Sequence, residues 1–205
     1  MLKKIDKKIK YCVGLNCRPG NIETILAQKA KDIYEVYAAC PSDISSTGRR
    51  GHYPIDLDEL KKQIGLAHEY GVRYNVLMNG SCFGGIEFSS VFQERISHFE
   101  EYLDDINADS VTVMNPFLID LVRKNSKKIE IIVGSFAEVM DPVKVKRFSS
   151  RGANRVVLHQ NVYRNFEMLK AIRKSTDLGL EIIPNQGCVY QCDAFISHIN
   201  IVAHS

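Results

Sequence analysis

The feature that most constrains this sequence is a strand–helix unit that recurs at intervals of roughly 25 to 30 residues. In each unit a short apolar or β-branched run is followed by a polar turn and an amphipathic helical pattern. Most of these runs are continuously apolar, which is typical of parallel strands covered on both faces. Strands are predicted at Tyr11–Leu15, Ile33–Tyr37, Arg73–Leu77, Ser110–Val113, Ile129–Val133, Arg155–Leu158 and Leu180–Ile183.

Residues that start and stop helices fall between these runs. N-caps are predicted at Asp56, Asp141 and Asn165. The helix that follows Asn165 is expected to turn Phe166, Leu169 and Ile172 inward. Regular alternation of strands and helices implies right-handed crossovers and one parallel sheet.

The fold class predicted is α/β, a TIM-like (β/α) barrel, with residues 1–205 forming one barrel-type domain. No Gly-x-Gly-x-x-Gly turn follows the first strand, which disfavours a dinucleotide-binding sheet. A closed barrel needs about eight strands, and the segment after the seventh holds only a short helix and a stub at Asn200–Ala203. The barrel is therefore either closed by this stub, open, or part of a longer chain. Open edges would call for a homodimer or a partner domain to cover them.

Composition narrows the class of protein. The net charge of +3 and the single basic run near the amino terminus do not indicate a nucleic-acid-binding protein. The sequence has no signal peptide and no 18-residue apolar run, so a cytoplasmic location with no membrane contact is expected. In that compartment the six cysteines are expected to be reduced, and such clusters more often serve metal or redox chemistry than disulfides.

Most of the cysteines follow the predicted strands. Cys188 and Cys192 are four residues apart, so a helical turn would bring both thiolates within reach of one metal ion or iron–sulfur cluster. Cys82 and then Cys40 are the next candidate ligands, with Cys17 in reserve. Zinc is the alternative to a cluster, because two histidines, His198 and His204, follow the pair.

Other polar residues at the strand ends are candidates for catalysis and substrate binding. Asp43, Glu138 and His159 could act as acid or base, or could equally be turn residues. Arg49 and Arg50 could hold an anionic substrate, or could lie in a solvated loop. Candidate substrate-binding amides are Asn79, Asn115 and Asn185. No Gly-x-Ser-x-Gly or His-Glu-x-x-His motif points to a known hydrolase site.

At these positions the chain resembles the collagenase-like peptidases of family U32. The matching segments are Glu35-Val36-Tyr37, Pro41-Ser42-Asp43, Asn79-Gly80-Ser81-Cys82-Phe83-Gly84-Gly85, Val111-Thr112-Val113-Met114-Asn115-Pro116, Ser135-Phe136-Ala137-Glu138-Val139 and Asn185-Gln186-Gly187-Cys188-Val189-Tyr190-Gln191-Cys192. The resemblance implies a TIM-like barrel and, as in several relatives, an iron–sulfur cluster that assists oxygen-independent hydroxylation of RNA bases or a quinone precursor. It also implies Cys82, Cys188 and Cys192 as ligands. Family members usually run longer, so a further ligand could lie outside this sequence.

Three functions remain open from the sequence. The first is an iron–sulfur enzyme that modifies a small molecule or a nucleic-acid base at the carboxyl ends of the strands. The second is a hydrolase acting on peptides through a metal-activated water or a carboxylate base, as the family name suggests. The third is a non-catalytic barrel that binds a partner and keeps its cysteines for structure.

Overall fold

The structure, a computed structural model, describes residues 9–41, 44–48 and 53–204. Its strands form a single parallel sheet of seven members in chain order, β1 to β7. The strands are β1 (Tyr11–Gly14), β2 (Ile33–Ala39), β3 (Arg73–Leu77), β4 (Ser110–Val113), β5 (Glu130–Val133), β6 (Arg155–Val157) and β7 (Gly179–Glu181). Within the described ranges no strand joins β7 back to β1, so the fold is an open, barrel-like sheet.

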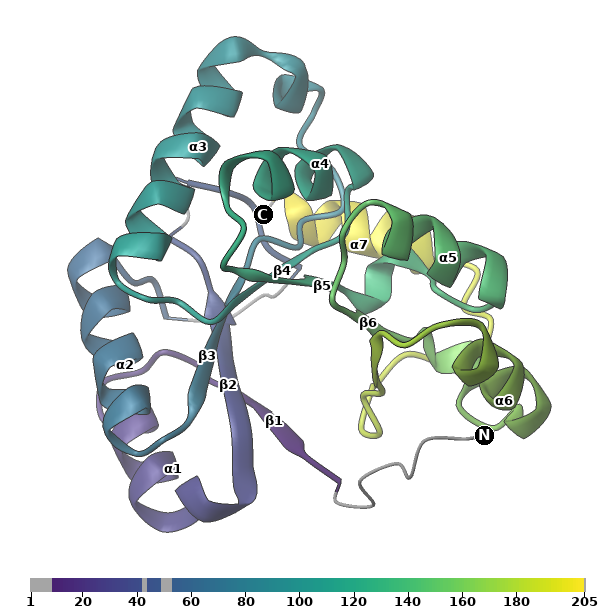
Figure 1. The fold of residues 1–205 in the computed structure, drawn as a ribbon, viewed down its shortest axis with the longest axis horizontal. Helices are drawn as coiled ribbons and strands as arrows, with labels where there is room; N and C mark the ends of the chain where they lie inside the picture. Colours follow the sequence, from purple (N-terminus) through teal and green to yellow (C-terminus); the bar gives the residue numbers. More distant parts are fainter. Residues whose placement is uncertain (1–8, 42–43, 49–52, 205) are drawn as a thin grey trace.

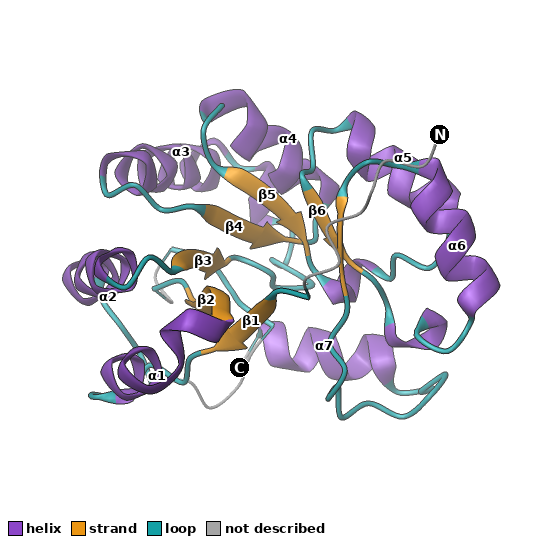
Figure 2. Ribbon diagram, turned by 60° about the horizontal axis from the view of Figure 1, so that its bottom comes forward, coloured by secondary structure: helices purple, strands orange, loops and turns teal. Residues whose placement is uncertain are grey.

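Helices connect the strands and lie outside the sheet (Figures 1 and 2). They are α1 (Asn21–Lys29), α2 (Leu57–Glu69), α3 (Ser90–Asp105), α4 (Pro116–Asn125), α5 (Pro142–Ser150), α6 (Phe166–Ser175) and α7 (Phe195–Ala203). Four short 3₁₀ helices are η1 (Ala30–Asp32), η2 (Ile86–Phe88), η3 (Ser135–Ala137) and η4 (Gln160–Val162). No helix in the part of the chain that the structure describes is long and apolar enough to cross a bilayer.

The predicted architecture is confirmed, and the predicted strand boundaries differ from the observed ones by at most two residues. The three predicted N-caps hold: the side chains of Asp56, Asp141 and Asn165 accept hydrogen bonds from backbone N–H groups of α2, α5 and α6. The predicted strand at Asn200–Ala203 is wrong, because these residues end helix α7. Phe195, Ile199 and Ala203 recur at helical spacing and are buried in α7. In a short apolar segment this spacing is hard to distinguish from a strand pattern. The inward direction predicted for Phe166 is also wrong, since this residue at the first turn of α6 is 69% exposed.

Alternate positions of each strand have different environments. Residues such as Val36, Val76 and Val111 face the helices and belong to the main hydrophobic core. Their neighbours along the strands face the barrel interior, where polar side chains are common. The sheet therefore separates an apolar outer layer from a polar interior.

The amino-terminal half of this interior is an ion network. Glu35 of β2, fully buried, forms an ion pair with Arg155 of β6, and Arg155 also lies 3.3 Å from Glu181 of β7. Ser110 donates to Glu35 at 2.8 Å. Cys12 of β1 lies beside the same groups, and burial raises the pKa of Cys12 to about 12, so its thiol stays neutral. Charges on three strands, β2, β6 and β7, thus join opposite sides of the open barrel from within.

A buried carboxyl on α3 makes stability depend on pH. Burial raises the pKa of Glu100 to about 7; the amide of Asn125 partly offsets this, and Asp104 adds to it. Because the folded value lies above the ordinary 4.5, the stabilising contribution is complete below about pH 4.5 and is lost as the pH rises through about 7. The difference between these two pKa values corresponds to about 3 kcal/mol of free energy.

We therefore expect Glu100→Gln to raise the free energy of unfolding by about 1 to 3 kcal/mol at about pH 8 and to leave it nearly unchanged at about pH 5. Urea unfolding at both pH values measures this. Glu101→Gln on the exposed face of the same helix is the matched control. Equal effects of the two substitutions at the higher pH would contradict the assignment.

Candidate functional site

A pocket of about 420 Å³ opens inside the barrel at the carboxyl ends of the strands. This end is where enzymes with a TIM-like barrel place their active sites. We call it the mouth pocket. It is lined by Tyr37, Gly48, Asn75, Leu77, Asn79, Thr112, Ile132, Gly134, Ser135, Phe136, Val157, Glu181, Ile183, Gln186, Gly187 and Cys188.

Inward-facing strand positions form the walls of the mouth pocket. Asn75 of β3 and Thr112 of β4 hydrogen-bond to each other at 2.8 and 3.0 Å, which fixes both side chains across the two strands. Ile132 and Val157 supply apolar surface from β5 and β6. The walls therefore offer neutral hydrogen-bonding groups next to apolar patches, as in most small-molecule sites.

Among the described residues that line the mouth pocket, Glu181 is the one carboxylate. It lies at the end of β7, where it links the pocket to the ion network through Arg155 at 3.3 Å. Burial raises the pKa of Glu181, and the charge of Arg155 opposes this. A carboxylate with a raised pKa inside a cleft has the properties of a general acid or base.

Tightly packed loops form the rim of the mouth pocket. The N–H of Gly48 donates to the Asn79 side-chain oxygen at 3.0 Å, which ties the loop after β2 to the loop after β3. A Cβ at Gly48 would lie 2.3 Å from the Phe136 ring, so only glycine fits. The bond to Gly48 leaves the NH₂ group of Asn79 as its available donor.

Helix α7 lies over the same end of the barrel. Its Phe195 ring packs against Phe136 at 6.0 Å and against His159 at 5.1 Å, between ring centroids. At its other end Asn200 accepts a hydrogen bond from Ser81 at 2.8 Å. These partners follow β5, β6 and β3, so α7 connects three loops of the rim.

Of the predicted acid–base residues, the two that the structure describes, Glu138 and His159, do not line the mouth pocket. His159 is 3% exposed beneath α7, its Nδ1 accepts from the N–H of Asn161, and burial lowers the pKa of His159. Glu138 follows η3 in a left-handed conformation with φ of 52°. Asp43 lies outside the described residues.

Of the predicted substrate-binding residues, Asn79 lines the mouth pocket. Asn115 instead caps α4 by accepting from the N–H of Phe117 at 2.9 Å. Asn185 is exposed in the turn after β7. Arg49 and Arg50 lie outside the described residues.

The structure does not gather the four predicted metal ligands. Cys188 lines the mouth pocket, and Cys192 lies four residues further along the same loop. The Cys82 sulfur accepts from the N–H of Gly84 at 3.4 Å, and the buried Cys40 thiol donates to the carbonyl of Ser45 at 3.2 Å. Over residues 9–41, 44–48 and 53–204, no three His, Cys, Asp or Glu side chains lie close enough to hold a metal ion. The donor set therefore does not fit a four-thiolate cluster in this arrangement.

Comparison with known proteins identifies the family. The model of peptidase family U32 matches residues 20–194. The chain belongs to peptidase family U32. It is 27% identical to an uncharacterized protease of Methanocaldococcus jannaschii, MJ1657, over 204 residues. That match covers 100% of this chain and 54% of the relative, so the chain spans about half the length of that protein.

Solved structures show the same fold around this U32 chain. The U32 peptidase Mk0906 superposes with a TM-score of 0.80 at 20% identity, covering 98% of this chain and 80% of that one. A fructose-1,6-bisphosphate aldolase-like protein from Coccidioides immitis gives a TM-score of 0.59 at 12% identity, covering 93% of this chain and 68% of the other. Both likenesses concern the barrel architecture.

Several pocket residues of this U32 chain lie within strands and not in the loops after them, where the sequence predicted the site. Tyr37, Asn75, Thr112 and Glu181 are polar residues at inward positions. The signal that could have found them is their two-residue spacing from other inward positions, such as Glu35 to Tyr37. Polar residues at inward strand positions indicate that the barrel interior can bind a ligand in addition to supporting the fold.

Proposed function

We propose that the mouth pocket binds a short peptide segment and that Glu181 acts as the general base for hydrolysis of its amide bond. The observation that carries this proposal is a single carboxylate of raised pKa among neutral amide and hydroxyl side chains. Asparagine, glutamine and threonine side chains complement the donors and acceptors of a peptide backbone. The description of the relatives as peptidases or a protease supports the same substrate class.

In the proposed reaction a water molecule lies between Glu181 and the substrate carbonyl carbon. Ionised Glu181 takes a proton from this water as its oxygen attacks, and then gives the proton to the leaving amine as the C–N bond breaks. The NH₂ group of Asn79 is placed to donate to a developing oxyanion at the rim. Arg155 favours the ionised form of Glu181 between turnovers.

Filling the mouth pocket is expected to abolish cleavage. A Cβ at Gly134 would lie 3.2 Å from Thr112 Cγ2 and 3.7 Å from the Asn79 Cβ, both on the pocket wall. The φ of −69° at Gly134 suits any residue. Gly134→Leu should therefore place its side chain in the substrate's space and lower cleavage of a defined peptide mixture by about tenfold or more, measured by mass spectrometry.

Gly65→Leu is the matched control for this substitution. Gly65 is exposed on α2 with no atom within 4 Å of an added Cβ, so cleavage should be unchanged. Circular dichroism would verify that both variants fold. Unchanged cleavage by a folded Gly134→Leu protein would contradict the location of the site.

A metal centre is our second proposal, in which Cys188 and Cys192 supply thiolates to an iron–sulfur cluster or a zinc ion. The observation in its favour is that both cysteines are partly exposed on one rim loop and that Cys188 faces the mouth pocket. Further ligands would have to come from rearranged rim loops or another polypeptide segment. This proposal includes the oxygen-independent modification of a small molecule or nucleic-acid base.

Metal analysis tests the second proposal. Protein purified without oxygen is expected to contain iron with sulfide, or zinc, and to lose it in Cys188→Ser and in Cys192→Ser. Cys12→Ser is the control, because Cys12 lies in the ion network and not at the rim. Metal content that is absent from the wild type, or that survives both rim substitutions, would exclude a site on this cysteine pair.

A further inference from the structure

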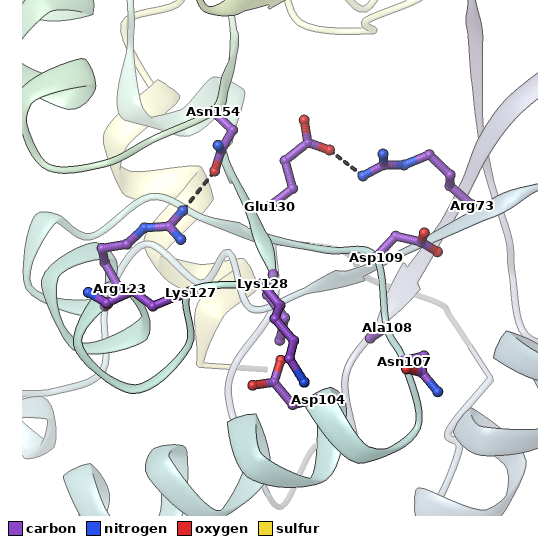
Figure 3. A pocket seen from close by; sticks show the side chains of 11 residues that line it. Arg73, Asp104, Asn107, Ala108, Asp109, Arg123, Lys127, Lys128, Glu130 and Asn154 are labelled. Carbon is purple, nitrogen blue, oxygen red and sulfur yellow. Dashed lines mark hydrogen bonds and ion pairs between the residues drawn. The ribbon is translucent and has the colours of Figure 1, made fainter.

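A second pocket of about 440 Å³ lies at the opposite end of the barrel (Figure 3). We call it the basal pocket. It is formed where the loops from α3 to β4, α4 to β5 and α5 to β6 meet the start of β3. Its basic residues are Arg73, Arg123, Lys127 and Lys128. The amino-terminal ends of barrel strands seldom take part in catalysis, so a ligand here would be separate from the mouth pocket.

Most acidic groups of the basal pocket already have partners. Glu130 forms an ion pair with Arg73, and Figure 3 shows these two side chains joined on one side of the pocket. Asp109 lies 2.8 Å from the His68 ring nitrogen. Asp104 accepts a hydrogen bond from Ser126 at 3.0 Å.

Within the described ranges, the basic groups on the other side form no ion pair with a carboxylate. Arg123 donates to the carbonyl of Gly152 at 2.9 Å, to the Asn154 side-chain oxygen at 2.7 Å and to the carbonyl of Ser126 at 3.4 Å, all of them neutral acceptors. Among the described residues, no carboxylate lies within 4.0 Å of its guanidinium nitrogens. Burial lowers the pKa of Arg123. A partly buried cation without a counter-ion is costly.

A second positive charge lies in the same pocket. The Lys127 ammonium donates to the backbone carbonyl of Arg123 at 3.1 Å. The Lys128 side chain also lines the pocket and runs toward Asp104 (Figure 3). The amides of Asn107 and Asn154 supply further polar groups to the same pocket.

We propose that the basal pocket binds a phosphate group, either free phosphate or the phosphate of a small ester, through the basic side chains of Arg123, Lys127 and Lys128 that line it. Guanidinium and ammonium groups together suit a tetrahedral dianion, which accepts several charge-assisted hydrogen bonds. The pocket volume suits a small molecule rather than phosphate alone. The site does not depend on hydrolysis at the mouth pocket, so either proposal can fail without the other.

Calorimetry and thermal unfolding of the whole chain test this site. Sodium phosphate and adenosine monophosphate are the probes, with sodium chloride at equal ionic strength and adenosine as their controls. We expect saturable binding and a rise in Tm with at least one phosphate probe and with neither control. Tighter binding of the monophosphate would identify an ester as the ligand, and equal binding would identify free phosphate.

The decisive comparison is between two double substitutions of equal charge. Lys127→Gln/Lys128→Gln should weaken phosphate binding by about tenfold or more, since two charged contacts are lost. Lys124→Gln/Lys146→Gln changes exposed lysines outside the basal pocket and should not alter it. A phosphate effect no larger than that of chloride, or an equal loss in both double variants, would overturn the proposal.

Discussion

Arg155→Met is expected to lower the free energy of unfolding by about 3 to 5 kcal/mol, the cost of breaking a buried ion pair from one side. Arg155 is 8% exposed and contacts Glu35 and Glu181 from inside the barrel. Without it, Glu35 keeps Arg73, whose Nε lies 3.7 Å away, the hydroxyl of Ser110 and the Cys12 thiol at 3.9 Å. A fully buried carboxylate would then lack its main counter-charge.

Two further variants separate this effect from the loss of side-chain volume. Arg151→Met removes an exposed ion pair with Asp120 and should cost no more than about 1 kcal/mol. Glu35→Gln/Arg155→Met removes both partners and should recover much of the stability lost in the single variant. The double variant also keeps the test valid if Arg155→Met does not fold.

Urea unfolding measures all of these variants on one scale. The prediction fails if Arg155→Met unfolds within about 1 kcal/mol of the wild type, or if the double variant is less stable than the single one. Either result would mean that the interior charges are well solvated. The open side of the barrel would then admit water to the network.

The fold could be predicted well from the sequence because the strands and the helix starts are marked by local sequence patterns. Apolar runs such as residues 131–133 and capping residues such as Asp141 carry their information locally. The end of the chain was harder, because Phe195–Ala203 is apolar enough to read as strand or helix. In the structure this segment is a helix whose Phe195 packs against Phe136 and His159. These contacts join residues that are far apart in the sequence.

The site was predicted only in part. The expected location at the strand ends agrees with the mouth pocket, and Asn79 and Cys188 line it. The roles of individual residues depend on which way each side chain faces, which is fixed by tertiary contacts. Asn115 has the strand-end position of a binding residue but serves as a helix cap. Glu181 was missed because the predicted strand ran from Leu180 to Ile183, which placed Glu181 inside the strand and not at its end.

The central claim is that Glu181 at the mouth pocket performs acid–base catalysis. Glu181→Gln keeps the shape of the side chain and removes its ability to take a proton. We expect cleavage of the peptide substrate to fall by about 10² to 10⁴-fold, the usual contribution of a general base. Glu101→Gln on the exposed face of α3 is the charge-matched control and should leave cleavage unchanged.

The direction of the pH dependence adds a second signature. A base works only when ionised, so wild-type activity should rise with pH as Glu181 loses its proton. Since burial raises the pKa of Glu181, this rise should occur above the ordinary 4.5 of a glutamate. This rise, the acidic limb of the pH–rate profile, should be absent in Glu181→Gln.

The most direct measurement is the pH–rate profile of peptide cleavage by the wild type, Glu181→Gln and Glu138→Gln. The account predicts a large loss and no acidic limb in Glu181→Gln, with the limb preserved in Glu138→Gln, because Glu138 does not line the mouth pocket. Full activity of Glu181→Gln, with the loss appearing instead in Glu138→Gln, would contradict it.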